Sequence, residues 1–330
     1  MTKDATWLDV PGGRVRVTSP AKIMFPAQRW TKLDLVEHYV TVGEGALRGV
    51  YGRPTVLKRW NRGVAGEPFF QKRAPKDSDH EYATIRFPSG RSADLLVPRT
   101  VRDIIWMVQL NCIDLNPWPV RAEDVEHPDE LRVDLDPTPD ATWRDVRAVA
   151  LVCGEVLSEH GLVGWPKTSG SRGMHLNVRI VAERSFTTVR RAALALAREV
   201  ERRSPDRATS AWWKEERHGV FVDYNQNARD RTVASAYSVR PTGWVSTPLT
   251  WDEVPDAEPQ DFPMDRFPER WTQVGDLTAG IDEATGSLDG LLELARRDEE
   301  QGLGDAPWPP HFPKQDDEPA RVQPSRRRPS

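Results

Sequence analysis

The pattern of apolar and polar positions along this chain predicts a mixture of helices and strands. Apolar side chains recur at helical spacing in residues 31–42, 101–110, 142–160 and 187–203. Short segments with strand-like composition or alternation occupy residues 55–60, 131–137, 174–181 and 219–225. The two kinds of element do not alternate strictly, so the pattern favours an α+β fold, or a mixed α/β sandwich, with mixed or antiparallel sheets.

Two of the predicted helices carry clear end signals. Thr31 and Thr142 each stand directly before the helical periodicity begins, where a hydroxyl can accept a hydrogen bond from the first turn. Gly161 follows the second of these segments, as is typical of a helix end. These signals predict the helix boundaries within a few residues.

The pattern changes near residue 255, where apolar periodicity is lost and proline and acidic residues become frequent. We therefore predict a folded domain over residues 1–275 and an acidic, proline-rich C-terminal extension over residues 276–330. Within the extension, Gly286–Arg297 keeps helical spacing and is expected to form one short helix. The chain after Gly302 is rich in proline and charge and ends in the basic run SRRRPS, so we expect disorder there.

The composition, 38% hydrophobic and 29% charged over 330 residues, excludes collagen-like, membrane and wholly disordered classes. No segment approaches the roughly 18 consecutive apolar residues of a membrane span, and the N-terminus lacks the apolar core of a signal peptide. We therefore expect a cytoplasmic protein. The two cysteines, Cys112 and Cys153, are too few for a disulfide framework and are expected to pack as small hydrophobes.

The formal net charge of -4 at first argues against a nucleic-acid partner. However, residues 1–249 hold 37 basic and 31 acidic side chains, residues 250–318 hold 5 and 19, and residues 319–330 hold 4 and none. A mildly basic body is therefore followed by an acidic segment. Because local positive surface matters more than average charge, the composition does not exclude a DNA partner.

Two aspartates stand two positions apart in the predicted strand LRVDLD, which places the carboxylates of Asp134 and Asp136 on one face of a sheet. Their repulsion is relieved by a divalent cation such as Mg²⁺ or Mn²⁺, which prefers oxygen ligands. Asp223 ends the apolar run VFVD and can approach the pair if the two strands are neighbours. The three would then suit a two-metal phosphoryl-transfer site. The alternative is a solvated strand edge, because an Asp-x-Asp pair alone is common.

The segment from Lys167 to His175, KTSGSRGMH, is rich in hydrogen-bond donors. Its two glycines allow backbone N–H groups to face an anion, and Ser169, Ser171 and Arg172 add hydroxyl and guanidinium donors. The glycine spacing matches neither a Walker A loop nor a Rossmann fingerprint. Such a segment alone is most often an ordinary loop. Its position between the aspartate pair and the third aspartate is an order that a nucleotidyltransferase could use.

Basic and aromatic residues are interleaved within residues 1–100, which hold 17 basic and 10 acidic side chains. Phe69 and Phe70 beside Lys72 and Arg73 suit single-stranded or gapped nucleic acid, because cations neutralise phosphates and aromatic faces accept unstacked bases. Adjacent strand residues point to opposite faces, so we expect at least one of the two phenylalanines in the core unless the segment is a loop.

Together these motifs resemble a known family. The runs RVDLDP, KTSGSRGMHLNV, VFVDYNQNAR, ASAYSVR and VSTPLTWDEV are similar, in order and separation, to the polymerase domain of bacterial DNA ligase D, a member of the archaeo-eukaryotic primase superfamily. SPAKIMFP, TKLDLVEHY, RPTVLKRW and FFQKR also match upstream, so the resemblance covers roughly residues 15–255. It implies a primase-polymerase core of two facing β-sheets flanked by helices, with an RRM-like half. It also implies a polymerase that fills short DNA gaps with two Mn²⁺ (or Mg²⁺) ions and NTP or dNTP substrates, often preferring ribonucleotides.

The resemblance also implies roles for individual residues. The two metal ions would be held by Asp134, Asp136 and Asp223, which would also be the catalytic residues. The incoming nucleotide would contact Lys58, Asn116, Ser169, Arg172, His175 and Arg240. The 5′-phosphate at the far side of a gap would be captured by Lys22 and Lys32, and the template would stack on Phe69 and Phe70. Histidine often stands in the family where this chain has Asn116, and lysine is common at the position of Arg172. Both departures bear on triphosphate binding.

The segment DLNPWPVR, in a chain without a ligase or nuclease module, resembles the stand-alone actinobacterial primase-polymerase C group. That resemblance implies gapped or broken DNA with a 5′-phosphate as a partner, with a separate ATP-dependent ligase of the C type and Ku as further partners. It also implies a monomer associated with the nucleoid.

Two other functions stay open at this point. A non-catalytic module could bind a 5′-phosphate and present gapped DNA to a ligase, although the three aspartates would then have no role. A metal-dependent nuclease could use the same aspartates, although the donor-rich loop and Arg240 would then have no role. The sequence does not decide between ribonucleotides and deoxyribonucleotides, the length of the gap, or whether synthesis can start without a primer.

Overall fold

The first of two central sheets has five strands in the order β11-β12-β10-β14-β13. Its strands are β10 (Glu130–Pro137), β11 (Trp165–Thr168), β12 (Met174–Arg179), β13 (Ala208–Thr209) and β14 (Val220–Val222). β10 runs antiparallel to both of its neighbours, β12 and β14. Its apolar residues join the main core, with helices α4 (Trp143–Glu159) and α5 (Phe186–Arg203) against that face of the sheet. Strand alternation therefore leaves the two aspartates of β10 on the opposite face.

The second sheet has the order β6-β5-β8-β7, with β9 paired to β5 at one end. Its strands are β5 (Thr55–Arg59), β6 (Phe69–Gln71), β7 (Glu81–Arg86), β8 (Ser92–Val97) and β9 (Asn116–Pro117). The helices beside it are α1 (Lys32–Thr41), α2 (Gly43–Val50), α3 (Val101–Gln109) and α6 (Phe267–Val274). Two small hairpins precede them, β1 (Ala5–Val10) with β2 (Gly13–Thr18) and β3 (Ile23–Phe25) with β4 (Trp30–Thr31).

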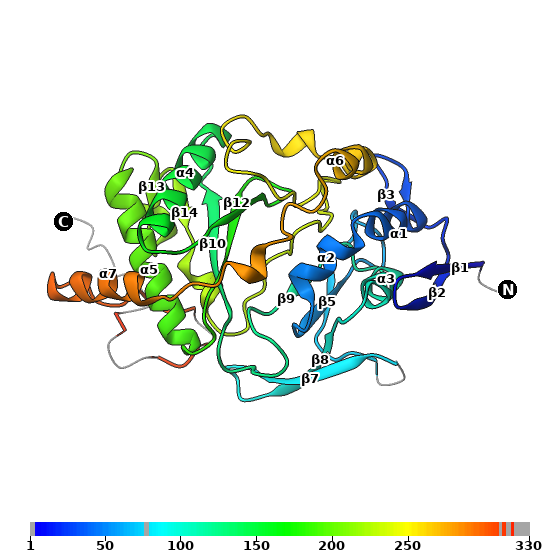
Figure 1. Ribbon diagram of the computed structural model, residues 1–330, viewed down its shortest axis with the longest axis horizontal. Helices are drawn as coiled ribbons and strands as arrows, with labels where there is room; N and C mark the ends of the chain where they lie inside the picture. The colour runs from blue at the N-terminus through cyan, green and yellow to red at the C-terminus, as the bar shows by residue number, and fades with distance from the viewer. Residues whose placement is uncertain (1–3, 76–78, 310–311, 315–317, 320–330) are drawn as a thin grey trace, which may run out of the picture.

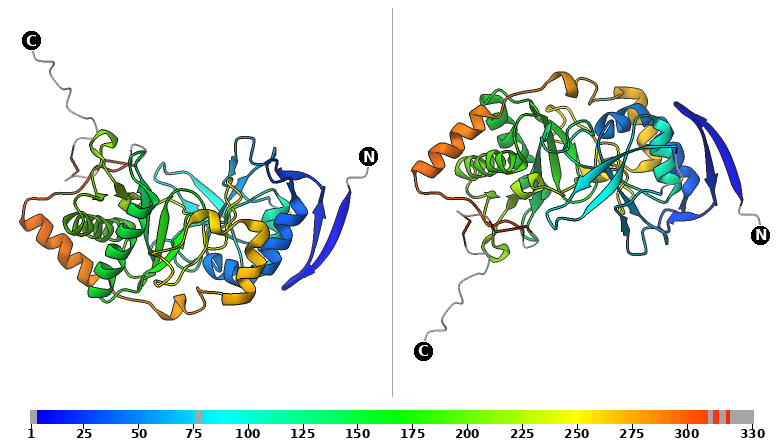
Figure 2. Two further views of the ribbon diagram at one scale, coloured as in Figure 1. Left: turned by 90° about the horizontal axis from the view of Figure 1, so that it is seen from above. Right: turned by 90° about the horizontal axis from the view of Figure 1, so that it is seen from below.

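The computed structural model describes residues 4–75, 79–309, 312–314 and 318–319. Figure 1 shows the two sheets at the centre of the molecule, with α4 and α5 on one outer side and α1, α2 and α3 on the other. The β1–β2 hairpin lies at one end and α7 (Asp289–Glu300) at the opposite end, as both views in Figure 2 confirm. This arrangement confirms the predicted α+β class with two sheets flanked by helices. Within the described residues, no helix combines the length and apolar character needed to cross a membrane.

The helix start signals in the sequence have the expected geometry. Thr31 caps α1 and Thr142 caps α4, and each side chain accepts a hydrogen bond from the N–H of the third helical residue, Asp34 or Asp145. The aspartate carboxylates in turn accept from the capping residues, which completes a capping box at both helices. These boundaries were predictable because capping depends on residues only three positions apart.

The C-terminal extension packs on the body further than its composition predicts. Its predicted helix is α7, which begins and ends three residues later than expected and buries Leu291 and Leu294 in the main core. Contrary to the expected disorder after Gly302, residues 303–309 follow the surface of α5, with Ala306 and Trp308 buried. Proline and charge do not prevent packing here, because Arg190 of α5 supplies hydrogen bonds to this segment. The predicted disordered basic end, residues 320–330, lies outside the described residues.

The molecule has two halves, one built on the first sheet and one on the second, and a buried ionic cluster joins them. Glu130, at the start of β10, accepts hydrogen bonds from Arg132 and Arg179. A carboxylate oxygen of Glu130 also lies 4.0 Å from the guanidinium group of Arg53. Arg53 precedes the second sheet in the chain and forms a further ion pair with Asp129. These three arginines neutralise Glu130 and hold its pKa far below the usual range of a carboxyl, despite the burial that opposes ionisation.

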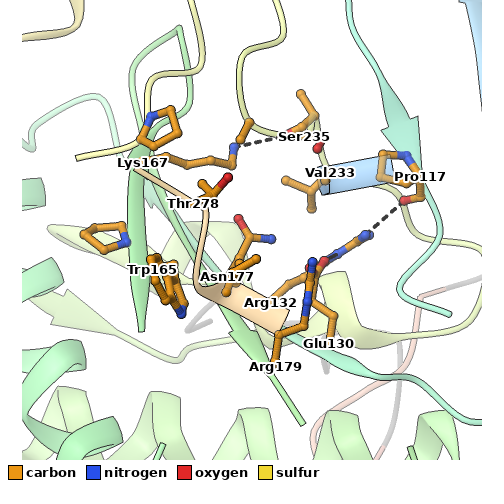
Figure 3. A pocket seen from close by; sticks show the side chains of 16 residues that line it. Pro117, Glu130, Arg132, Trp165, Lys167, Asn177, Arg179, Val233, Ser235 and Thr278 are labelled. Atoms are coloured by element: carbon orange, nitrogen blue, oxygen red, sulfur yellow. Dashed lines mark hydrogen bonds and ion pairs between the residues drawn. The ribbon is translucent and has the colours of Figure 1, made fainter. Parts of the chain in front are cut away.

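A small cavity of about 20 Å³ lies beside this cluster, between the two halves (Figure 3). Its walls include Arg132 and Trp165 of the first sheet and Pro117 of the second, whose carbonyl accepts from Arg132 Nη2 at 3.0 Å. A volume of this size holds about one water molecule, so it adds no binding site for an organic ligand.

Candidate active site

The three predicted metal-binding aspartates come together at two inner strands of the first sheet. Asp134 and Asp136 lie on β10, and Asp223 follows β14, where its N–H donates to the carbonyl of Asp134 at 2.8 Å. One carboxylate oxygen from each residue lies within 4.8 Å of the others. β14 therefore supplies the third carboxylate because it is the immediate neighbour of β10 in the sheet.

Crowding and burial raise the pKa of all three carboxyl groups. Burial is the main cause for each, and repulsion from Asp134 adds to it at Asp136 and Asp223. The pKa of Asp223 is raised to about 7. A cluster that resists ionisation in this way is relieved by a divalent cation, and hard carboxylate oxygens at these separations fit Mg²⁺ or Mn²⁺. The donor set thus agrees with the metal expected from the sequence.

Asp134 contacts His175, and His175 in turn contacts the buried Lys167. His175 stands opposite Asp134 across the β10–β12 ladder, with its Nε2 atom 3.2 Å from Asp134 Oδ1. Lys167 Nζ lies 2.7 Å from His175 Nδ1 and donates to the Ala234 carbonyl and Ser246 Oγ. When the lysine is charged, its third N–H donates to Nδ1, so the imidazole proton resides on Nε2 and faces Asp134. Burial holds the pKa of His175 well below its ordinary value, which keeps the ring neutral.

The donor-rich loop lies over the same face of the sheet. The buried Ser169 hydroxyl accepts hydrogen bonds from the N–H groups of Ser171 and Gly173, so this side chain shapes the turn. Arg172 is exposed on the loop and contributes positive potential toward Asp136. The loop lines one cleft of about 500 Å³ together with Asp134 and Asp136.

Other residues that line this cleft include two cations. Lys58 of β5 and Asn116 of β9 come from the second sheet, and Arg240 lies outside both sheets; all three line the cleft together with Asp134 and His175 of the first sheet. The fully buried carboxylate of Asp114 accepts from Lys58 Nζ at 3.0 Å and from Asn116 Nδ2 at 3.1 Å. Its Oδ2 atom also lies 4.0 Å from Arg240 Nε, which has no hydrogen-bond partner among the described residues. Every predicted nucleotide-binding residue therefore borders the same cleft as Asp134 and Asp136.

The sequence interpretation missed three residues that organise this cleft: Lys167, Asp114 and Gln226. Lys167 opens the donor-rich motif, but only the tertiary structure shows that it holds His175. Asp114 lies two positions before Asn116, and a charge inside an apolar run was the available signal. Gln226 Nε2 donates to Asp223 Oδ2 at 3.2 Å and also hydrogen-bonds Asp134. No local pattern distinguishes Gln226 from other polar residues of its loop.

The two phenylalanines of β6 are both exposed, which corrects the expectation that at least one would be in the core. Phe69 and Phe70 are 55% and 53% exposed. β6 is an edge strand, and neither of its faces is covered at this point, so alternation does not bury either ring. Phe70 borders the cleft, with Lys58 Nζ 5.9 Å from its ring centroid.

The two predicted phosphate-binding lysines lie together, away from the aspartates. The backbone N–H of Lys32 donates to the Lys22 carbonyl at 2.8 Å. Lys22 Nζ donates to the Asn61 carbonyl and to Asn111 Oδ1, and burial and nearby Arg59 lower its pKa. Lys32 is buried, and its ammonium group donates to the carbonyls of Thr18 and Gln109. Lys22, being partly exposed, is the more accessible of the two to a ligand.

Comparison with known proteins yields consistent matches. A family model described as the LigD primase-polymerase domain matches residues 31–278. The multifunctional non-homologous end joining protein LigD of Mycolicibacterium smegmatis is 30% identical over 310 residues, covering 91% of this chain and 40% of the relative. The LigD protein of Pseudomonas aeruginosa is 31% identical over 236 residues, covering 68% and 27%. The chain thus spans less than half the length of these relatives.

A solved structure is also similar. The polymerase domain of Mycobacterium tuberculosis ligase D, determined in complex with DNA, superposes with a TM-score of 0.76 at 29% identity. The match covers 82% of this chain and 98% of that domain.

Proposed function

This chain belongs to the LigD primase-polymerase domain family, and we propose that it is a nucleotidyltransferase that extends a primer strand across short gaps in DNA during break or excision repair. The observation that carries the proposal is the composition of one cleft. Asp134 and Asp136 line it and form one cluster with Asp223, and Lys58, Arg240 and the donor-rich loop provide cationic and neutral donors around the cluster. A carboxylate cluster facing donors is what transfer of a nucleotide from a triphosphate requires.

In the proposed reaction, the 3′-hydroxyl of a primer attacks the α-phosphorus of a nucleoside triphosphate, and pyrophosphate leaves. Asp134, Asp136 and Asp223 would hold two divalent ions, which supply Lewis-acid stabilisation of the attacking and leaving oxygens when bound. Lys58, Arg172 and Arg240 would bind the triphosphate and stabilise its charge. Asp114 preorganises Lys58 and Asn116 for this task, because its buried carboxylate fixes both side chains before the nucleotide arrives.

His175 and Ser169 contribute mainly orientation in this proposal. With Lys167 charged, the neutral His175 presents its single N–H, on Nε2, toward Asp134, and a phosphate oxygen of the nucleotide would share or take over that hydrogen bond. Ser169 accepts from the N–H groups of Ser171 and Gly173 and so maintains the turn that carries Arg172 at the cleft. Asn116 places a side-chain amide at the cleft where histidine is common in the family. Its Nδ2 atom donates to the carbonyl and to Oδ1 of Asp114, which fixes the side chain at the position proposed for the nucleotide contact.

For DNA, we propose that Phe69 and Phe70 stack on template bases and that Lys22 and Lys32 form the site of the 5′-phosphate beyond the gap. The exposure of both rings, and the position of Phe70 at the cleft, support the first assignment. The DNA-bound state of the similar M. tuberculosis domain supports a DNA partner. The end-joining names of the relatives support a role in DNA end joining, and we propose Ku and a separate ATP-dependent ligase of the C type as the partners.

The proposal is tested by primer extension on DNA with a gap of one to three nucleotides. NTPs are compared with dNTPs, Mn²⁺ with Mg²⁺, and a 5′-phosphate with a 5′-hydroxyl beyond the gap. We expect the primer to lengthen and the 5′-phosphate to increase extension. Shortening of the primer would instead favour a nuclease, and tight binding without turnover would favour the non-catalytic module that presents DNA ends.

The affinity of the site for Mn²⁺ is expected to rise with pH and to level off above about pH 7. The carboxyl groups must be ionised to bind a cation, and the pKa of Asp223, raised to about 7, means that protons compete below that value. Below about pH 7, Mn²⁺ must displace protons from the carboxyl groups. For each proton displaced, lowering the pH by one unit is expected to raise the Mn²⁺ dissociation constant by up to about tenfold. Electron paramagnetic resonance of free Mn²⁺, recorded from about pH 5.5 to 8.5, measures the Mn²⁺ dissociation constant at each pH. A flat profile would contradict the proposed ligands.

A further inference from the structure

The orientation of Asp223 depends on the short helical turn that follows it, Tyr224–Asn227. The N–H of Asn225 donates to Asp223 Oδ1 at 2.8 Å, and the side chain of Gln226 donates to Asp223 Oδ2 at 3.2 Å. Both oxygens of the carboxylate are therefore held by this turn. A shift of the turn would move the third carboxylate relative to Asp134 and Asp136, because these two lie on another strand.

Arg190 of α5 holds this helical turn in place. Arg190 is 1% exposed, and its Nε–H donates to the side-chain carbonyl of Asn225 at 2.9 Å. Its guanidinium also stacks on Tyr224, with 5.2 Å between the guanidinium carbon and the ring centroid. Arg190 thus contacts two of the four residues of the turn.

The other donors of Arg190 are satisfied by the C-terminal segment, residues 305–308, which lies beyond the family match at residues 31–278. Nη1 donates to Asp305 Oδ1 at 2.7 Å, and Nη2 donates to the carbonyls of Ala306 and Pro307 at 3.0 and 3.1 Å. The ring of Trp308 lies 4.2 Å from the guanidinium carbon, and its Nε1–H donates to Asp305 Oδ2 at 2.8 Å.

A second contact connects the same segment to the turn. Trp308 packs with Ala228, the residue that ends the turn, in a small apolar cluster that also includes Phe312. The C-terminal segment therefore reaches both ends of the turn, through Arg190 at Asn225 and through Trp308 at Ala228.

We propose that residues 305–308 are a positioning element for the active site, which holds the Asp223 carboxylate in its metal-binding orientation through Arg190 and Asn225. The inference rests on the proposed function of the aspartates. A buried guanidinium must keep its hydrogen-bond partners, because an unpaired buried charge is costly. Once Asp305 is removed, Arg190 loses its only carboxylate partner among the described residues, and the geometry that anchors Asn225 is relaxed.

The test uses the full chain and the binding of Mn²⁺, followed by electron paramagnetic resonance without nucleotide or DNA. Asp305→Ala is expected to raise the Mn²⁺ dissociation constant about tenfold, at the lower end of the effect of residues that orient metal ligands. Glu299→Gln is the matched control, because Glu299 pairs with Arg191, the next residue of α5, but is exposed and does not reach the turn. This control is expected to bind Mn²⁺ like the wild type.

A double variant separates positioning from general loosening of the fold. If the path runs through Arg190 and Asn225, Asp305→Ala combined with Asn225→Ala binds Mn²⁺ no more weakly than Asn225→Ala alone. Additive losses, or an unchanged dissociation constant in Asp305→Ala, would overturn the inference while leaving the proposed function intact. Failure of the wild type to bind Mn²⁺ would overturn both. If Asp305→Ala does not fold, Asp305→Asn, which keeps an acceptor oxygen, replaces it and is expected to give a smaller shift in the same direction.

Discussion

Replacing Asp134 with Asn is expected to reduce primer extension by about 1,000-fold or more while leaving the fold intact. Asp134 is the buried central carboxylate, adjacent in space to Asp136 and Asp223. Loss of one charged ligand removes metal stabilisation of the transition state worth about 4 kcal/mol, and each 1.36 kcal/mol is about a factor of ten in rate. The amide keeps the size of the side chain and can still accept from His175, so the surrounding packing is preserved.

Melting temperatures distinguish loss of metal binding from loss of folding in this variant. Without metal, Asp134→Asn is expected to raise the melting temperature, because it removes a like charge from a crowded cluster. With Mn²⁺ the wild type is expected to gain stability by mass action, and the variant is expected to gain much less. Asp140→Asn is the control, since Asp140 is exposed, accepts from Thr138 and lies close to Asp136 in sequence. Full extension by Asp134→Asn would refute the assignment of the metal site.

Replacing Glu130 with Gln is expected to lower the free energy of unfolding by about 3–5 kcal/mol at pH 7. Glu130 is 4% exposed and accepts from two buried arginines, Arg132 and Arg179. A neutral amide leaves those cations inside the protein without their shared counter-ion. The cluster also includes Arg53 from the other half of the molecule, so its loss is expected to weaken the contact between the two sheets that form the cleft.

The pH dependence of this effect follows from the pKa of Glu130. Its pKa is lowered in the folded protein, so its stabilising contribution is present above the unfolded pKa, near 4.3, and is lost as the pH falls below that value. Chemical denaturation at pH 7 and near pH 3.5 should therefore show a smaller difference between wild type and Glu130→Gln in acid. Glu293→Gln, which removes an exposed ion pair with Arg296, is the control and should change little at either pH. An equally small change in Glu130→Gln would show that the cluster does not stabilise the fold.

Local structure was largely predictable because it depends on neighbouring residues. Thr31 and Thr142 begin helices through contacts three positions along the chain, and the alternation in LRVDLD placed Asp134 and Asp136 on one face before the strand's partners were known. The resemblance to the ligase D polymerase domain rested on motif order, and the family match confirms it.

Other features could not be predicted because they depend on which strands become neighbours. Asp223 joins the pair only because β14 lies next to β10, although 87 positions separate Asp223 from Asp136 in the chain. Phe69 and Phe70 are both exposed because β6 is an edge strand, which no alternation pattern reveals. The packing of residues 303–309 was missed because the segment belongs to a proline-rich, charged stretch without apolar periodicity. Its binding partner, Arg190, lies on a helix more than 100 positions earlier.

The amino-acid sequence alone determined the types of element, the candidate residues for the chemistry and the family to which their order is similar. Only the tertiary structure decided how these residues act together. It placed Asp114 beneath Lys58 and Asn116, set Lys167 behind His175 and brought the C-terminal segment to the turn of Asp223. The physical reason is that secondary structure follows from short-range geometry, whereas burial, ion pairing and pKa shifts depend on the packing of segments far apart in the chain.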